Sequence, residues 1–356
     1  MTELTVGTKK GLFMLDGEPG SEFALSGRAF SGEPVEYALR DPRSGRLFAA
    51  VTNSFYGSKV FYADDVDGEW TQAAGLALPD GGEEALERIW VITPGEEDGL
   101  LYAGGDPGVL FTSRDGGESW DLNEALWRHR VEEDWQPGGG GLCLHSIVPW
   151  PGAPQKLTVA VSAAGVWHTD DGGQTWRRGN SGLVPRYMPD EARETTTQLC
   201  VHSICRSPRQ PERFFMQFHG GVYRSDDAGE SWVSIGDGLP SDFGFPLAID
   251  PGDPDCAFVI PLGADTDRVT PGGQVRVFET RDGGASWSPR GDGLPQQDAY
   301  LTVLRQAFDS HGAGDALELY FGATSGELFG SCDAGATWST AALRLPPVFS
   351  VTAAAA

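Results

Sequence analysis

A tryptophan that closes a glycine-rich turn recurs along this chain, and this repeat constrains the fold more than any other feature. At intervals of 50, 56, 56, 55 and 51 residues stand Trp70, Trp120, Trp176, Trp232, Trp287 and Trp338. Each interval contains several short apolar stretches that are broken by Gly and Pro. A period of roughly 50 residues of this kind is typical of small sheets repeated around an axis. The spacing therefore predicts an all-β ring.

Five of the six turns share the pattern (Ser/Thr)-x-Asp-x-Gly-x-(Ser/Thr)-Trp. They span residues 113–120, 169–176, 225–232, 280–287 and 331–338. The Asp side chain can accept bonds from nearby backbone N–H groups, and Gly supplies the positive φ of a tight hairpin. The Trp that follows is expected to bury its ring between neighbouring sheets. The segment Asp65-Val66-Asp67-Gly68-Glu69-Trp70 keeps the acid and the ring, so we interpret it as a worn copy of the same turn.

These turns resemble the Asp-box, or bacterial neuraminidase repeat, of β-propeller proteins, and the resemblance covers most of the chain. Families that carry the box include sialidases, xyloglucanase-type glycoside hydrolases, sortilin-like receptors and a photosystem II assembly factor. The resemblance implies a propeller fold and no particular activity, because unrelated functions share it. It also implies that a functional site would lie around the central axis, on the face opposite the Asp-box turns.

The repeat divides into blades of four antiparallel strands, and the two chain ends complete one more blade. Six units account for residues 33 to about 345. The N-terminal stretches Glu3 to Thr8, Gly11 to Asp16 and Glu22 to Ser26 match second, third and fourth strands, and Pro347 to Ala353 matches a first strand. Joining them removes an exposed sheet edge. We therefore predict one domain, residues 1–356, that forms a seven-bladed β-propeller; the alternative is six blades with loose ends.

Composition limits the partners and the compartment. With 26 basic against 51 acidic residues, the formal charge is −25, which argues against a nucleic acid or an anionic membrane as partner. The first residues show no signal-type apolar region, and no stretch approaches the ~18 apolar residues of a membrane span. The five cysteines are an odd number at strand-like positions, as expected of small buried residues in a reducing compartment. We expect a cytoplasmic protein.

Polar residues at equivalent positions of the first strands give the sharpest chemical indication. Six residues before a proline stand Glu36, Arg88, His145, His202 and Phe245. A ring of blades should bring these positions together near the axis, and a buried strand rarely tolerates ionisable residues without a partner or a role. His219 falls on a second-to-third loop beside the strand of His202. The sequence therefore predicts a polar cluster on the central face.

Three interpretations of this cluster stay open. In the first, the side chains form a satisfied polar plug, in which Glu36 pairs with Arg88 and the histidines bond to backbone. In the second, Glu36 is a general acid or base, His145 and His202 carry protons, and Arg88 or Arg305 holds an anion. In the third, a divalent metal is bound by His145, His202 and His219, since imidazole suits Zn, Cu and Fe.

The second interpretation favours a polar, carbohydrate-like small molecule as ligand, with glycoside hydrolase or lyase chemistry. Trp135, in the long loop 121–144, could stack on a sugar ring. Arg88-Ile89-Trp90 only partly matches the Arg-Ile-Pro setting of sialidases, so true sialidase activity is not expected. Xyloglucanase-type enzymes work between two propellers, whereas this chain has one. The second carboxylate of a glycosidase could be any of Glu33, Glu83, Glu84, Glu87 and Glu194.

Two other classes of function remain as alternatives. One is a non-catalytic scaffold that binds another protein through the central face, as the resemblance to the photosystem assembly factor implies. The other is a metal enzyme built on the three histidines. Ionisable side chains that converge on an open pocket would favour a small-molecule site, whereas a flat apolar patch over a plugged channel would favour a scaffold.

Overall fold

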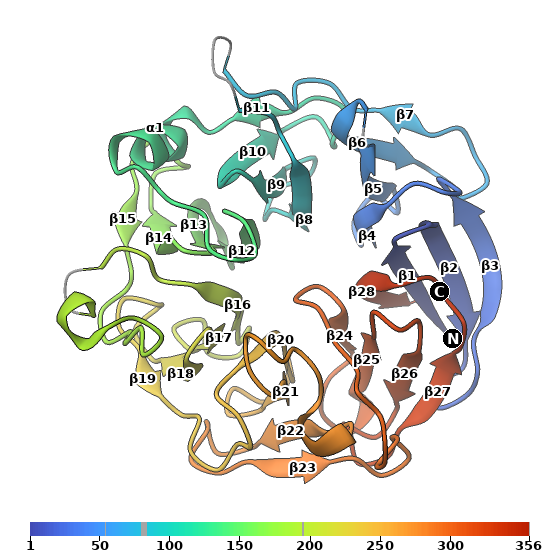
Figure 1. Ribbon diagram of the computed structural model, residues 1–356. Helices are drawn as coiled ribbons and strands as arrows, with labels where there is room; N and C mark the ends of the chain where they lie inside the picture. The colour runs from blue at the N-terminus through green and yellow to red at the C-terminus, as the bar shows by residue number, and fades with distance from the viewer. Residues whose placement is uncertain (54, 80–83, 194–195, 356) are drawn as a thin grey trace.

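The structure is a ring of seven sheets around a central axis (Figure 1). It is a computed structural model, and it describes residues 1–53, 55–79, 84–193 and 196–355. Within these residues each sheet has four strands, and every paired neighbour is antiparallel. The predicted seven-bladed propeller is confirmed.

We number the blades in chain order and describe each from its first strand, nearest the axis, to its fourth. The strands of blades 1 to 3 are β4 (Val35–Arg40), β5 (Leu47–Asn53), β6 (Gly57–Ala63) and β7 (Thr71–Gln72); β8 (Arg88–Pro94), β9 (Leu101–Asp106), β10 (Val109–Ser113) and β11 (Asp121–Leu122); and β12 (Leu144–Trp150), β13 (Ala153–Val161), β14 (Gly165–Thr169) and β15 (Arg177–Arg178). The strands of blades 4 to 6 are β16 (Val201–Arg206), β17 (Phe214–Phe218), β18 (Gly221–Ser225) and β19 (Val233–Ser234); β20 (Gly244–Ile249), β21 (Ala257–Pro261), β22 (Val277–Thr280) and β23 (Ser288–Arg290); and β24 (Phe308–His311), β25 (Glu318–Gly322), β26 (Leu328–Ser331) and β27 (Ser339–Ala342).

Blade 7 is built from both ends of the chain, as the sequence predicts. Its strands are β28 (Val348–Ala355), β1 (Thr2–Thr8), β2 (Gly11–Gly17) and β3 (Ala24–Ala29). The ladder between β28 and β1 pairs Val351 with Val6, and both side chains are buried. The fourth strand begins at Ala24, slightly later than the predicted Glu22. Because the last strand of the chain completes the first sheet, the ring has no open seam between the termini.

The five Asp turns, which we define as residues 113–120, 169–176, 225–232, 280–287 and 331–338, each connect a third strand to a fourth strand. In the first of them Asp115 accepts hydrogen bonds from the backbone N–H of Glu118 and Ser119 at 3.1 and 3.0 Å, and from the hydroxyls of Ser113 and Ser119. The Ser113 hydroxyl also accepts from the buried N–H of Gly117 at 2.9 Å. The turn is therefore closed by side chains at both of its ends.

Three of the tryptophans after these turns, Trp176, Trp232 and Trp287, donate a hydrogen bond to the preceding blade, whereas Trp120 and Trp338 donate to a carbonyl of their own turn. The ring of Trp232 is buried, and its Nε1 donates to Gly179 O, which follows the last strand of blade 3, at 2.9 Å. In blade 5, Trp287 donates in the same way to Ile235 O of the preceding blade, at 2.6 Å. Burial of such a large ring contributes on the order of 3 kcal/mol to stability, so these three turns each stabilise their own hairpin and one blade interface.

The face opposite the Asp turns carries the connections into each first strand and those from second to third strands; we call it the central face. Its longest predicted loop, 121–144, contains the helix α1 (Glu124–Glu132), which begins at Asn123, whose side chain accepts from Leu126 N. Short 3-10 turns lie at η1 (Asp190–Ala192), η2 (Pro271–Gly273) and η3 (Gly314–Ala316). Among the described residues no helix combines the length and the apolar character that crossing a bilayer requires.

Candidate functional site

A β-bulge at the start of the first strands determines which side chains reach the axis. The pairing with the second strand skips one residue in blades 1 to 4, and the skipped residues are Glu36, Trp90, His145 and His202. In blade 5 it skips Phe245 together with the residue after it. A bulge re-aims the extra side chain, and such irregularities are common beside functional sites.

The position six residues before a proline therefore does not match the bulge in every blade. In blade 2 the bulged residue is Trp90, whereas Arg88 is the first residue of β8 and pairs with Asp106 in the ladder. The proline that served as reference, Pro94, lies within β8 rather than after it. Arg88 still reaches the site, because its side chain is long, but it enters from the rim of the strand.

Both ring nitrogens of His145 have hydrogen-bond partners within the protein. Its Nε2 lies 2.9 Å from Val201 O, which can only accept, so the proton is on Nε2 and Nδ1 accepts from Ser146 Oγ at 2.9 Å. Burial first, and the nearby Arg305 charge second, lower the pKa of His145 to about 3. The ring is therefore neutral and has no free nitrogen, which matches the plug interpretation and leaves no lone pair for a metal.

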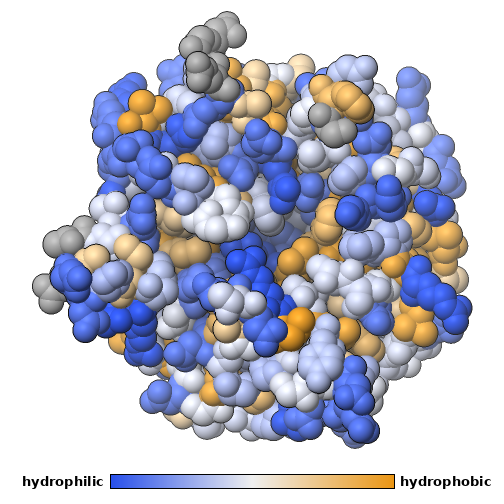
Figure 2. Space-filling model, viewed as in Figure 1, coloured by the Kyte–Doolittle hydropathy of each residue, from blue (hydrophilic) through white to orange (hydrophobic). Residues whose placement is uncertain are grey.

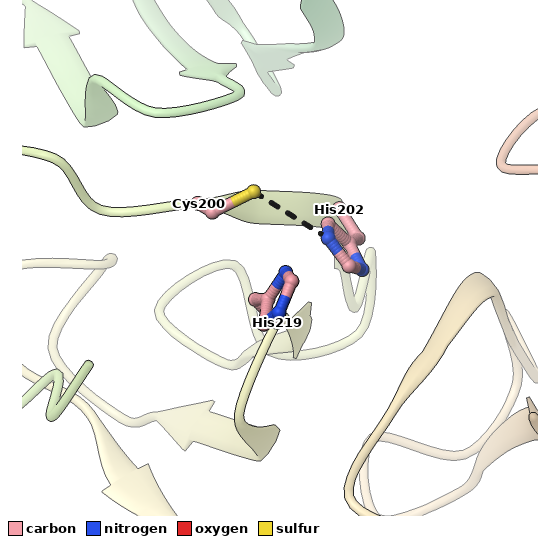
Figure 3. Close-up of side chains that lie close together, drawn as sticks. All are labelled: Cys200, His202 and His219. Atoms are coloured by element: carbon pink, nitrogen blue, oxygen red, sulfur yellow. Dashed lines mark hydrogen bonds between the residues drawn. The ribbon is translucent and has the colours of Figure 1, made fainter. Parts of the chain in front are cut away.

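His202 has the opposite tautomer and lies in a different group. Its Nδ1 donates to Gly244 O at 2.6 Å, so Nε2 carries the lone pair and faces Cys200 Sγ at 3.5 Å. The ligand atoms of Cys200, His202 and His219 all lie within 4.8 Å of one another (Figure 3). Burial holds the pKa of His202 well below its usual range. The structure thus brings two of the three predicted histidines together and adds a cysteine where His145 was expected.

Arg88 lies between two carboxyl groups whose pKa values are raised. Its Nε is 3.6 Å from Glu36 Oε1. Burial raises the pKa of Glu36, and the Arg88 charge and the nearby Thr52 hydroxyl only partly oppose this. Burial likewise raises the pKa of Asp106, against the Arg88 charge and a long contact with Cys143 Sγ at 3.8 Å. Both carboxyl groups are thereby suited to hold a proton at higher pH than an exposed acid.

Arg305 is the central cation of the face. It belongs to the segment before β24, which reaches into the centre of the ring (Figure 1). The next residue, Gln306, crosses the axis and donates from Nε2 to His145 O at 2.6 Å. The Arg305 guanidinium lies 4.8 Å from the centre of the Phe245 ring and 5.6 Å from that of Trp90. Residues from blades 2, 3, 5 and 6 therefore meet here.

The donors of this centre are not satisfied by the protein. Arg305 Nε and Trp90 Nε1 are buried and have no hydrogen-bond partner, and Arg305 Nη2 makes only a long bond of 3.4 Å to Ser162 Oγ. The Arg268 guanidinium carbon lies 5.5 Å from the centre of the Phe245 ring. Within the described residues no carboxylate lies within 4.0 Å of the Arg268 or Arg305 guanidinium. Positive charge is concentrated here in a protein whose net charge is strongly negative.

The centre of this face is hollowed, and hydrophilic residues line the hollow (Figure 2). Beneath Arg305 and His145 a cavity of about 430 Å³ follows the axis between the first strands of blades 3 to 6. Two further ionisable groups lie along it. Arg206 has Nε and Nη1 buried without a partner, and burial raises the pKa of Asp309 to about 6. Of the central-face residues described above, His145, Arg305 and Gln306 line this cavity, whereas Trp90, Phe245 and Arg268 do not.

Other residues named from the sequence lie away from this centre. Trp135 is buried; the centre of its ring lies 5.1 Å from that of Trp167, and its Nε1 donates to Glu133 Oε2 at 3.2 Å. Its loop position predicts an exposed ring that could stack on a sugar, and the buried ring differs from this prediction. Of the candidate second carboxylates, Glu84 pairs with Arg130 and Glu33 accepts from Asn53. Two more, Glu83 and Glu194, lie outside the described residues.

Sequence reasoning missed four residues of the site: Trp90, Asp106, Cys200 and Arg268. The run Leu199-Cys200-Val201-His202 contains a usable signal, because residues two apart on a strand point to the same side. The Arg268 position, in a loop, has no such regularity. Asp106 ends β9 beside the rim of β8, which only the strand register reveals.

Fold and site together define a seven-bladed propeller with a polar, cationic centre on the face opposite its Asp turns. Among solved structures, the chain is similar to an ancestral GH74 enzyme, with a TM-score of 0.58 and 17% identity over 83% of this chain. The chain spans 36% of the length of that enzyme. It is also similar to YCF48 from Cyanidioschyzon merolae, with a TM-score of 0.53, 12% identity, and 87% of this chain and 88% of that chain covered.

A third similar structure is YCF48 bound to D1 peptide, with a TM-score of 0.50, 13% identity, and 83% and 78% of the two chains covered. These similarities support the predicted likeness to glycoside hydrolase and YCF48 propellers at the level of fold. No protein-family model and no curated protein matches the sequence.

Proposed function

We propose that the central face binds an anionic, carbohydrate-like small molecule, such as an acidic sugar, with Arg305 as its anchor. One observation carries the proposal: two buried donors, Arg305 Nε and Trp90 Nε1, lack an acceptor, and they belong to side chains whose guanidinium-to-ring distance is 5.6 Å. Buried donors in native proteins are almost always satisfied, so two unpaired donors indicate a missing acceptor.

Charge defines what kind of acceptor would fit. Arg305 and Arg268 flank one aromatic ring and repel each other, and that repulsion contributes to lowering the pKa of Arg305 after burial. A carboxylate, sulfate or phosphate group between them would offset both charges and accept a forked pair of hydrogen bonds. A neutral ligand would supply acceptors but leave the two charges uncompensated.

The walls of the site favour a ligand that also has an apolar surface. Trp90 and Phe245 are adjacent to the two cations, and aromatic side chains commonly contact the C–H faces of sugars. Hydroxyl groups of such a ligand could reach Glu36 and Asp106, which flank Arg88. This mixture of one anion site, polar side chains and rings is the reason for choosing an acidic sugar rather than a simple inorganic ion.

Acid–base chemistry on the bound ligand is a second step of the same proposal. The raised pKa values of Glu36 and Asp106 make each a candidate proton donor, as hydrolysis or elimination requires. The buried, neutral His145 is not assigned a role in proton transfer, because neither ring nitrogen is free.

The test is a binding measurement by calorimetry with glucuronate and galacturonate, using glucose as the neutral counterpart. We expect the acids to bind and glucose to bind at least tenfold more weakly. Arg305→Gln should weaken the binding of the acids by about 10- to 100-fold, since hydrogen bonds to charged groups contribute roughly 1.5–3 kcal/mol. Arg276→Gln is the matched control, because Arg276 directly precedes β22, the third strand of its blade, and among the described residues its guanidinium donates a hydrogen bond only to Gln296.

The result that rejects the proposal is equal binding of acid and neutral sugars, or unchanged binding in Arg305→Gln. Thermal unfolding of both variants establishes that they are folded. If binding is confirmed, Glu36→Gln and Asp106→Asn separate binding from chemistry: turnover of a uronate glycoside should be lost, while affinity for the free acid should fall far less than in Arg305→Gln.

A protein-binding scaffold is the alternative function, and one feature favours it. Phe55 and Tyr56, in the loop between β5 and β6 on the central face, are 89% and 78% exposed. They lie beside a groove of about 490 Å³ that includes Leu76 and Leu86. Exposed aromatic pairs of this kind are common at protein interfaces. Absence of any small-anion binding would make this the stronger proposal.

A further inference from the structure

We propose that Cys200, His202 and His219 form a binding site for one thiophilic metal ion, Zn²⁺ or Cu⁺. The site goes beyond the anion-binding function and does not depend on it. All three residues belong to blade 4: Cys200 directly precedes β16, His202 is the bulged residue of β16, and His219 lies in the hairpin between β17 and β18. Figure 3 shows the three side chains pointing toward one another.

The distances between the ligand atoms of the three residues can be compared with those of a zinc coordination shell. Ligand atoms at about 2.3 Å (sulfur) and 2.05 Å (nitrogen) from a tetrahedral zinc are separated from each other by about 3.6 Å. The observed distance between Cys200 Sγ and His202 Nε2 is 3.5 Å. The remaining separations are all within 4.8 Å, so the His219 ring must move closer for its nitrogen to reach bonding distance. A thiolate with two imidazoles is a donor set that suits Zn²⁺ and Cu⁺ rather than Mg²⁺ or Ca²⁺.

The second layer of contacts orients the ligands correctly. A metal-binding histidine usually donates its other N–H to a backbone carbonyl or a carboxylate. His202 does this through Nδ1 and Gly244 O, at 2.6 Å, so its lone pair is directed to the site. The His219 backbone N–H donates to Cys200 O at 3.0 Å, and the Tyr187 hydroxyl accepts from Cys200 N at 2.8 Å. These bonds tie the ligand-bearing segments to one another before any ion arrives.

The proton balance of binding is simple. In the metal-free protein the Cys200 thiol donates its hydrogen to His202 Nε2. On binding, the ion forms bonds with sulfur and with both nitrogens, the S–H bond breaks, and one proton leaves to solvent. No electron is transferred, and no other reactant is required.

The surrounding charges limit which ions the site accepts. Arg305 and Arg268 lie near His219, opposed by Asp265, whose carboxylate is 3.7 Å from His219 Nε2. The negative thiolate leaves a site with Zn²⁺ with a net charge of one and makes a site with Cu⁺ neutral. Repulsion between the bound ion and the two arginines is therefore reduced. His219 is partly exposed, with 20% of its side chain accessible, and gives the ion a route from the central face.

The experiment uses the full, untagged chain, freed of metal by a chelator and then equilibrated with Zn²⁺ or, under reducing conditions, with Cu⁺. We expect one ion per chain after gel filtration, measured by elemental analysis. Substituting Co²⁺ for Zn²⁺ should give a thiolate-to-cobalt charge-transfer band. Cys200→Ser and His219→Gln should each weaken affinity by at least about 100-fold, since loss even of an outer-layer contact costs 10- to 100-fold.

Cys143→Ser is the matched control. Cys143 is also buried and close to Arg305, but its Sγ contacts Gly140 O at 3.2 Å and lies outside the three-residue group. It should bind metal as the unchanged protein does. The proposal is overturned if Cys200→Ser binds with unchanged affinity, if Cys143→Ser loses binding equally, or if the cobalt form shows no thiolate band. Metal-dependent thermal stabilisation, present in the unchanged chain and absent in folded Cys200→Ser, guards against a variant that merely misfolds.

Discussion

The hydroxyl that begins each Asp turn offers a direct test of what holds the blades together. Ser113 is buried, its hydroxyl donates to Asp115 at 2.8 Å and accepts from Gly117 N at 2.9 Å. Ser113→Ala removes both bonds in one step. It leaves a buried N–H without a partner, whereas the carboxylate of Asp115 keeps three other donors.

The size of the effect follows from this asymmetry. An unsatisfied buried donor costs about 1–3 kcal/mol, whereas the exposed carboxylate can exchange its lost bond for one to water. We therefore expect Ser113→Ala to lower the free energy of unfolding by about 2 kcal/mol. The chain supplies its own control, because Thr169 and Thr280 occupy the same position in two other turns and are equally buried. Ser113→Thr should change stability by less than about 0.5 kcal/mol.

The assay is equilibrium unfolding in urea, with the midpoint compared at unchanged slope. A Ser113→Ala midpoint equal to that of the unchanged protein would show that the Gly117 N–H is satisfied elsewhere. A Ser113→Thr variant as unstable as Ser113→Ala would show that shape, rather than the hydroxyl, controls the turn. Ser225→Ala repeats the experiment in blade 4, where the same pair of bonds occurs.

Two further predictions concern the turns and the closure of the ring. Hydrogen bonds from Thr175 and Ser286 lower the pKa values of Asp171 and Asp282 to about 2. The stability that these two turns contribute should therefore be complete above about pH 4 and should be lost as the pH falls toward 2. The measurement is an NMR titration of the carboxyl carbons, and pKa values near the ordinary 3.8 for both groups would contradict the prediction. Removing residues 347–356 should expose the edge of β1, so the shortened chain should self-associate, as measured by size-exclusion chromatography. Removing only residues 355–356 should leave a monomer-like profile. Identical profiles for the two truncations would refute the role of β28 in closing the ring.

The repeat predicted the fold because its signals are local. Asp and Gly in a hairpin determine their own turn, and a fixed spacing then determines the order of the sheets. The closing blade followed from a count of leftover strands, since β28 and β1 have no other edge to occupy. The sequence predicts a loop where the helix α1 lies, because the hydrophobic pattern of this helix is weak, although Asn123 caps it.

The site was predicted less well because its residues depend on register rather than on spacing. The proline spacing places Glu36, His145 and His202 at the bulged position, but in blade 2 the bulged residue is Trp90, and Pro94 is the last residue of the strand. The opposite tautomers of His145 and His202 could not be read from two nearly identical segments. They are determined by which carbonyl each ring meets, Val201 O for one and Gly244 O for the other.

The same bulge explains why one propeller can place such different chemistry around its axis. Every first strand must keep its ladder and its apolar contacts, so most of its positions are restricted to small or branched apolar residues. The bulged residue is released from the ladder and faces the channel, where its neighbours come from other blades. Its side chain can therefore vary without disturbing the sheet, and it does: a carboxylate, an indole, two imidazoles and a phenyl ring occupy this position in blades 1 to 5. The Asp turns, which stabilise the blades, lie at the opposite face, so they and the proposed binding site occupy different ends of the same strands.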